Sequence, residues 1–249
     1  MDIVYHRDFQ KVYASDPAAR AGRMEAILRE LAGDHRFVEP EPALEEQLRA
    51  VHSQSHIDAV KSDSVLYRVA CLSSGGAIRA AELAMEGAPS FALIRPPGHH
   101  ASSGHSWGFC FFNNVAVALA CLRDEGRIRR AFILDFDLHF GDGTADIFAG
   151  TGIAYFQPGS GRREVLLEEI RQKLRAERGY EILAVSAGFD RHEADWGGEL
   201  TTDDYRVIGS LAKEASQTVC RGRRFGVLEG GYNYDVLGKN VKAFLEGFA

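Results

Sequence analysis

The chain has 249 residues, of which 45% are hydrophobic and 26% are charged, a balance typical of a globular protein. This length is enough for one large α/β domain and does not demand a second one. The formal net charge of -6 argues against a general nucleic-acid-binding protein, because such a protein needs a basic face. We therefore expect no direct nucleic-acid partner.

No segment indicates a secreted or membrane protein. The first residues lack the basic and apolar segments of a secretory signal. The apolar stretch at 115–122 is too short to span a bilayer. Cys71, Cys110, Cys121 and Cys220 are scattered without paired spacing, which indicates reduced and mostly buried thiols. We therefore predict a cytoplasmic protein with no membrane partner.

Helix-like and strand-like segments alternate along the chain. Asp16 and Pro17 begin a mixed apolar and charged run to Leu31, which predicts an N-terminal helix capped by Asp16. Buried strands are predicted at 91–94, 131–134, 153–156, 182–185 and 225–228. Helical spacing occurs at 74–85, 114–123, 164–175 and 203–220. The alternation predicts one three-layer α/β/α domain over residues 1–249, with a mainly parallel sheet covered on both faces.

Polar residues with reactive side chains follow several of the predicted strands. His99 comes after the strand at 91–94, Asp135 and Asp137 after 131–134, Asp190 after 182–185 and Tyr232 after 225–228. In open parallel sheets, ligands bind outside the carboxyl ends of the strands. We therefore expect these residues to converge on one crevice.

The sequence D-F-D-L-H at 135–139 offers metal-ligating groups at alternate positions. If the strand continues here, Asp135, Asp137 and His139 share one face because side chains alternate along a strand. Asp137, His139 and Asp190 form a one-histidine, two-carboxylate set that leaves a position open for water, as metal-assisted hydrolysis requires. Such ligands suit Zn²⁺, Fe²⁺ or Co²⁺. The alternative is a strand end with solvated aspartates and a helix cap at Asp142.

Two further turns carry groups suited to proton transfer and oxyanion binding. The prolines and glycine at 96–98 hold His99 and His100, whose imidazoles can accept and return protons near neutral pH. Two glycines precede Tyr232, whose phenol could donate to a developing oxyanion. A structural histidine pair and a glycine turn with an anchoring tyrosine are the alternatives. The other histidines are interpreted as structural or surface residues: His6, His35, His52, His56, His105 and His192.

Five motifs occur in order: R-P-P-G-H-H-A at 95–101, G-F-C-F-F-N-N at 108–114, D-F-D-L-H-F-G-D-G-T at 135–144, S-A-G-F-D at 186–190 and E-G-G-Y-N at 229–233. Together they resemble the arginase–deacetylase superfamily, in its zinc-dependent histone deacetylase-like and acetylpolyamine amidohydrolase branch. Fainter similarity reaches the N-terminal helix, so that nearly the whole chain is covered. The resemblance implies an α/β/α fold of the arginase–deacetylase type.

The resemblance also implies a role for each candidate residue. Asp137, His139 and Asp190 would hold Zn²⁺, which with the substrate carbonyl would activate a water molecule. His100 would be the principal general base and then the acid. His99 would be its electrostatic or proton-shuttling neighbour.

Other positions would support these groups or contact the substrate. Asp135 would orient His99's ring and Asp142 that of the general base, as carboxylates behind an imidazole do. Tyr232 would donate to the tetrahedral oxyanion. Gly108 and Phe109 would line a narrow tunnel for an extended acyl-amine chain.

The family also carries a monovalent cation, usually K⁺, beneath the zinc. The backbone carbonyls of Asp135, Asp137 and His139 and the Asp135 carboxylate match its ligands. Two departures concern aromatic residues: Phe140 stands where a second histidine is usual, and Trp196 lies near the expected mouth. The segments at 157–181 and 61–76 are shorter than in typical relatives, without clear counterparts of a second tunnel aromatic or an acidic rim residue. We therefore expect a complete catalytic floor below a shallower, more open rim.

These features predict a zinc-dependent amidohydrolase that removes an acyl group, first of all acetyl, from a primary amine on an extended chain. Candidate substrates are acetyl-lysine in proteins or peptides, acetylpolyamines and other small acylated amines. One alternative is an arginase-type amidino hydrolase, which would use two metals. Another is a catalytically weak acyl-amine-binding module, which the shortened loops would allow. Open loop edges would also suit an oligomer in which a partner subunit covers them.

Overall fold

The computed structural model describes residues 1–31, 33, 35–159 and 161–249. Within these residues, a seven-stranded sheet has the strand order β2-β1-β3-β7-β6-β4-β5, and neighbouring strands pair in parallel. The strands are β1 (Asp2–Val4), β2 (Arg36–Val38), β3 (Ser90–Ala92), β4 (Ala131–Asp135), β5 (Ile153–Phe156), β6 (Leu183–Ala187) and β7 (Arg224–Leu228). The predicted α/β fold with a mainly parallel sheet is confirmed.

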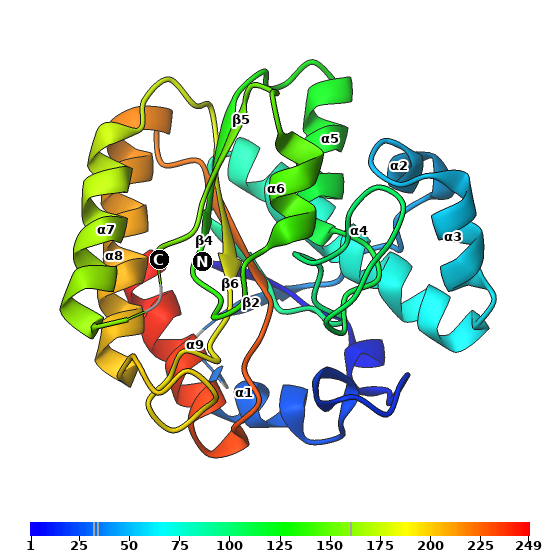
Figure 1. Ribbon diagram of the computed structural model, residues 1–249, viewed down its shortest axis with the longest axis horizontal. Helices are drawn as coiled ribbons and strands as arrows, with labels where there is room; N and C mark the ends of the chain where they lie inside the picture. Colours follow the sequence, from blue (N-terminus) through cyan, green and yellow to red (C-terminus); the bar gives the residue numbers. More distant parts are fainter. Residues whose placement is uncertain (32, 34, 160) are drawn as a thin grey trace.

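Helices cover both faces of the sheet, which gives the predicted three layers (Figure 1). One layer consists of helices that pack side by side: α7 (Arg163–Ala176), α8 (Thr202–Cys220), α9 (Tyr234–Phe248) and α1 (Arg23–Leu31). The other is built on α4 (Ser64–Met85) and α5 (Asn114–Asp124), with α2 (Glu45–Arg49), α3 (Gln54–Lys61) and α6 (Asp142–Phe148) beside them. Across the described ranges, every helix is too short or too polar to cross a lipid bilayer.

The burial of each element follows its sequence pattern. All five residues of β4 and all five of β6 are buried, because strands covered on both faces need continuous apolar runs. In α7, by contrast, the buried residues Leu166, Ile170 and Leu174 lie four apart and form one stripe of an otherwise charged helix. Tightly buried strands therefore present their carboxyl ends, and the loops that follow, in fixed positions.

Most predicted segments coincide with observed elements, although several bounds differ. The strands predicted at 91–94, 182–185 and 225–228 correspond to β3, β6 and β7, and the helix predicted at 74–85 is the second half of α4. The short strands β1 and β2 and the helices α2, α3, α6 and α9 are additional to the prediction. Of these, β1, β2 and α2 have only three to five residues, which is too little periodicity to be recognised in a sequence.

The helix predicted from Asp16 to Leu31 is interrupted, which corrects the prediction. Asp16 is a cap, but its carboxylate accepts from the Ala19 amide at 2.9 Å at the start of a 3₁₀ turn, Pro17–Ala19. Gly22 has a φ of 90°, a left-handed conformation that separates this turn from α1. At the start of α1, the buried Arg23 donates to the carbonyls of Gly231 and Glu229, at 2.9 and 2.6 Å. The interruption thus lets α1 support the loop after β7.

Candidate metal and acid-base site

The candidate residues meet at the carboxyl ends of four neighbouring strands. β3, β7, β6 and β4 are adjacent in the sheet. Residues 99–100 follow β3, residues 137–139 follow β4, Asp190 follows β6 and Tyr232 follows β7. This is the crevice that strand topology predicts for a ligand.

Asp137, His139 and Asp190 form a compact set of donors. One donor atom of each residue lies within 4.8 Å of the other two. His139 Nδ1 lies 3.3 Å from Asp137 Oδ1 and 3.0 Å from Asp190 Oδ2. Backbone amides hold the other carboxylate oxygens: Gly230 donates to Asp137 Oδ2 at 2.8 Å and Leu138 donates to Asp190 Oδ1 at 3.0 Å. Each carboxylate is thereby oriented with one oxygen toward the shared centre.

The donor set fits a divalent cation. Asp190 Oδ2 is buried, and apart from the contact with His139 Nδ1 at 3.0 Å it has no hydrogen-bond partner among the described residues. Burial, and then the charge of Asp137, raise the pKa of Asp190 to about 6. A hydrogen bond to Asp137, and then the Asp190 carboxylate, raise the pKa of His139 to about 10. A cation would pair both buried carboxylates and bind Asp190 Oδ2, which explains why these groups are placed together.

Two glycines make room for the carboxylates. A Cβ added to Gly188 would overlap the Asp137 carboxylate. A Cβ added to Gly230 would lie 2.6 Å from Asp137 Oδ2 and 2.8 Å from Asp190 Oδ2, closer than such atoms approach. Gly188 follows β6 and Gly230 follows β7, so that both strand ends lack side chains where the backbone approaches the donor set.

His100 is held by Asp142 and covered by Trp107. With the proton on Nδ1, His100 donates to Asp142 Oδ1 at 2.7 Å, which makes Nε2 the acceptor nitrogen. Burial and the neighbouring His99 lower the pKa of His100 to about 4, so that the ring is neutral at pH 7. Trp107 donates from Nε1 to the other Asp142 oxygen at 2.8 Å. No sequence motif points to Trp107, because its contact with Asp142 depends on the fold.

His99 has the opposite protonation preference. Its Nδ1 lies 3.1 Å from Asp135 Oδ2, and its Nε2 lies 3.8 Å from Asp137 Oδ1. Burial disfavours the charged ring, but the Asp137 and Asp135 carboxylates outweigh burial and raise the pKa of His99 well above its usual value. The rings of His99 and His100 are 4.1 Å apart. A charged ring beside a neutral one is the arrangement that a general base and an electrostatic neighbour need.

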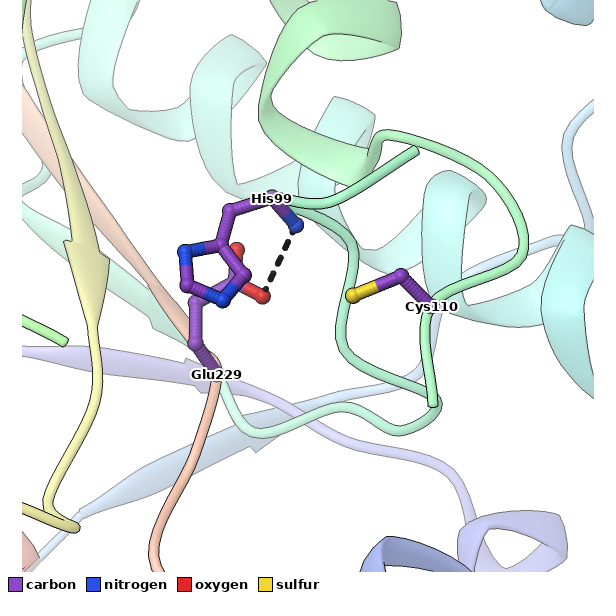
Figure 2. Close-up of side chains that lie close together, drawn as sticks. All are labelled: His99, Cys110 and Glu229. Atoms are coloured by element: carbon purple, nitrogen blue, oxygen red, sulfur yellow. Dashed lines mark hydrogen bonds between the residues drawn. The ribbon is translucent and has the colours of Figure 1, made fainter. Parts of the chain in front are cut away.

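A second group of potential metal ligands consists of His99, Cys110 and Glu229 (Figure 2). Glu229 Oε2 accepts from the backbone amides of Gly98 at 2.6 Å and His99 at 3.3 Å, and the latter bond is dashed in Figure 2. Burial raises the pKa of the Cys110 thiol well above its usual value, so that the sulfur stays protonated and is a poor ligand. We therefore assign Glu229 to anchoring the histidine loop. Its position at the end of β7, before two glycines, is the signal by which sequence reasoning could have found it.

A cavity of about 130 Å³ adjoins the donor set. Aromatic rings form much of its wall, and several candidate reactive residues also line it. Its lining residues are Pro97, His99, His100, Trp107, Gly108, Phe109, His139, Trp196, Gly230 and Tyr232. The three residues predicted to contact substrate, Gly108, Phe109 and Trp196, all lie in this lining.

Tyr232 is fixed in the cavity wall by stacking and by its backbone. Its ring lies 4.1 Å from that of Trp196 at an interplanar angle of 26°, and Phe109 approaches edge-on at 5.9 Å. The amides of Tyr232 and Asn233 both donate to Asp195 Oδ2 at 2.8 Å. Burial raises the pKa of Tyr232 well above its usual value, so that the phenol keeps its proton and can act as a donor.

Groups expected to bind a monovalent cation already have protein partners. The Gln157 side-chain amide donates to the carbonyls of Asp137 and His139, at 2.7 and 2.8 Å. Arg191 Nε donates to the carbonyl of Asp137 at 3.0 Å. The residues of this loop therefore do not fit the K⁺ site that the family resemblance implies. No sequence motif points to Gln157 or Arg191, since both act across loops.

Comparison with known proteins agrees with the fold and the site motifs. The histone deacetylase domain family matches residues 16–157 and 156–248. A protein named probable deacetylase from Methanothermobacter thermautotrophicus is 32% identical over 91% of this chain and 84% of its own length. An acetylpolyamine amidohydrolase from Burkholderia pseudomallei is 31% identical over 73% of this chain and 63% of its own length. The crystal structure of the HDA15 HD domain superposes with a TM-score of 0.86 at 22% identity, over 99% of this chain and 88% of that one.

The chain belongs to the histone deacetylase domain family. The superfamily resemblance seen in the five motifs is thus confirmed. So is the class of protein, a hydrolase that acts on amide bonds.

Proposed function

We propose that the chain is a zinc-dependent deacylase that hydrolyses the amide of an N-acylated primary amine, first of all an N-acetyl group. The observation that carries this proposal is the meeting of a three-ligand donor set, a neutral histidine and a phenol at one cavity. Membership of the histone deacetylase domain family supports the reaction class. Zn²⁺ is the proposed metal, with Fe²⁺ and Co²⁺ as alternatives, because the donors are nitrogen and oxygen without thiolate.

Asp137, His139 and Asp190 would hold the metal, which when bound supplies Lewis acidity toward the acyl oxygen and a lowered pKa of water. His100 Nε2 accepts the proton of the attacking water and returns it to the leaving amine. Asp142 holds the Nδ1–H of that ring in place, and keeps the accepting nitrogen directed at the cavity.

Two further groups stabilise charge during the reaction. Tyr232 donates its phenolic hydrogen to the tetrahedral oxyanion, and its place in the cavity lining supports this role. His99 contributes a positive charge beside the general base, oriented by the Asp135 carboxylate at 3.1 Å. The groups proposed to handle the oxyanion and the proton, Tyr232 and His100, both line the same small cavity.

The cavity supports a small acyl group on an extended apolar chain. Phe109 and Trp196 lie 6.5 Å apart in a T-shaped arrangement, and both line the space of about 130 Å³. Such walls suit the methylene chain of an acylated lysine or polyamine. Acetyl-lysine in proteins or peptides, acetylpolyamines and other small acylated amines are therefore the proposed substrates.

We also propose that residues 1–249 act as one histone deacetylase-like domain in the cytoplasm. A hydrophobic core that includes residues of both helical layers and the sheet supports one domain. The described cysteines are free and buried, as is usual for proteins of a reducing compartment.

Turnover of matched substrates tests the proposed function. Protein of measured metal content would be given acetylated, longer-acylated and trifluoroacetylated lysine and polyamine substrates, with and without added Zn²⁺. We expect metal-dependent release of the acid, and the preferred pair identifies the amine and the acyl group. Stoichiometric zinc without turnover of any substrate would contradict a deacylase and favour an acyl-amine-binding module.

A further inference from the structure

The loop below the metal ligands is supported by side chains where related proteins are expected to hold a monovalent cation. The groups matching such a cation are the Asp135 carboxylate and the backbone carbonyls of Asp135, Asp137 and His139. Two of these carbonyls, those of Asp137 and His139, converge on a single atom, Gln157 Nε2, at 2.7 and 2.8 Å. A cation that bound both carbonyls would have to displace this nitrogen.

The Gln157 amide is held by hydrogen bonds at both its nitrogen and its oxygen. A glutamine amide has two N–H donors and an oxygen with two lone pairs. Its two donors serve the two carbonyls, while Oε1 accepts from the Gly141 amide at 3.0 Å and lies 2.9 Å from the Tyr155 hydroxyl oxygen. The side chain is therefore held from both ends and is oriented with nitrogen, rather than oxygen, toward the carbonyls.

Arg191 adds a positive charge to the same loop. Its side chain is 1% exposed, and Nε donates to the carbonyls of Phe136 and Asp137 at 3.2 and 3.0 Å. Nη1 pairs with the Glu199 carboxylate at 2.5 Å and Nη2 donates to the Pro158 carbonyl at 3.3 Å. A guanidinium stays charged at any ordinary pH, so that it attracts carbonyl oxygens as a bound cation does.

The Asp135 carboxylate, another of the expected ligands, is also engaged. Tyr155 donates to Asp135 Oδ2 at 2.9 Å, and the Asp137 amide donates to Oδ1 at 3.0 Å. Burial raises the pKa of Tyr155 far above its usual value, so that the hydroxyl remains a donor. The carbonyls of Asp137 and His139 and the Asp135 carboxylate are thus met by donors from β5, from the chain directly after it, and from the loop after β6.

We propose that Gln157 and Arg191 replace the monovalent cation of related proteins, so that this chain neither binds nor requires K⁺ at that position. Both are positioning residues: they hold the carbonyls between Asp137 and His139 and, through them, the metal ligands. The proposal concerns support of the loop and does not depend on acyl hydrolysis.

Potassium content and salt-specific stability test this proposal on the whole chain. The protein would be exchanged into choline chloride, its retained K⁺ measured by atomic emission, and its Tm compared in KCl and choline chloride at equal ionic strength. We expect no stoichiometric K⁺ and equal Tm values. About one K⁺ per chain, or a Tm higher in KCl than in choline chloride, would overturn the proposal.

The variant Gln157→Ser should open the position that the amide fills. We expect this variant to gain a K⁺-specific rise in Tm of about 2–4 °C that grows with KCl concentration, as binding to the folded state requires. The matched control Gln172→Ser removes an exposed glutamine on α7 and should show no K⁺ response. If Gln157→Ser folds and its Tm does not depend on K⁺, the amide does not occupy a cation position and the proposal is wrong. If the variant does not fold, the measured K⁺ content of the unchanged protein tests the proposal instead.

Discussion

Trp107 lies against the ring of His100, with ring centroids 3.9 Å apart at an interplanar angle of 33°. The two rings also share a carboxylate, because Asp142 accepts from Trp107 Nε1 at 2.8 Å and from His100 Nδ1 at 2.7 Å. A half-exposed tryptophan thus both covers the proposed base and fixes the group that orients it. Of the three residues, Trp107 alone lies outside the five sequence motifs.

Trp107→Phe tests the orienting hydrogen bond while it keeps an aromatic cover. We expect kcat to fall about tenfold, because partners that orient a catalytic imidazole contribute about 10–100-fold. Steady-state kinetics on the preferred acyl-amine would measure this fall in kcat. In Asp142→Asn, kcat should fall further, because that substitution removes the carboxylate itself. An unchanged kcat in Trp107→Phe would show that the indole hydrogen bond does not orient the ring.

Tyr232→Phe removes the proposed oxyanion donor without changing the ring that stacks on Trp196. We expect turnover to fall by about a hundredfold or more, the contribution of one such donor. Metal content and Tm should stay close to those of the unchanged protein, since the phenol contacts no proposed metal ligand through a hydrogen bond in the described structure. Full activity in this variant would exclude Tyr232 from the mechanism.

Asp190→Ala removes one oxygen ligand of the proposed metal. We expect loss of bound metal after gel filtration and loss of the stabilisation that added Zn²⁺ gives the unchanged protein, because a ligand stabilises the state that binds it. Asp203→Ala, at an exposed carboxylate in the first turn of α8, is the matched control and should keep its metal. Stoichiometric metal in the Asp190 variant would contradict the ligand assignment.

His52 should make the protein less stable in acid. The buried ring donates to the Ser102 carbonyl and accepts from the Asn113 amide, and burial lowers its pKa from 6.5 to about 4. Between these values the unfolded chain binds the proton and the folded chain does not, so that stability falls as pH falls. The contribution is about 1.4 kcal/mol per pH unit within that window.

Urea denaturation of His52→Gln between pH 7 and pH 4 would check this. A glutamine can keep one donor and one acceptor but does not titrate, so the variant should lose less stability on acidification than the unchanged protein. His105→Gln, at an exposed histidine, should leave the slope as it is. Parallel pH dependences for the His52 variant and the unchanged protein would refute the assignment.

The sequence predicted the central strands and the placement of reactive residues after them because both depend on local pattern. Fully buried strands such as β4 are continuous apolar runs, and Asp137 and His139 stand two apart just beyond it. The order of strands in the sheet was beyond such reasoning, since alternation of strands and helices does not specify which strands are neighbours. The reaction class could not be inferred from local pattern alone, and it was predicted from the family resemblance of the five motifs.

The supporting residues were missed because their partners are remote in the chain. Glu229 accepts from the Gly98 amide 131 positions away, and Arg191 donates to the Asp137 carbonyl 54 positions away. A lone glutamine or arginine after a strand has many uses, so Gln157 and Arg191 signal no role before the fold brings their partners near. The expected K⁺ site illustrates this, since the carbonyls were recognised but not the side chains that fill it.

Because Gly188 and Gly230 have no Cβ atom, these two positions limit which substitutions the chain can tolerate. Neither residue performs chemistry, yet a single methyl group at either position would collide with the Asp137 carboxylate. In a saturation mutagenesis screen, these two positions should therefore tolerate substitution as poorly as the acidic residues beside them. The site therefore depends on the absence of a Cβ atom at these two positions as well as on the presence of the carboxylates.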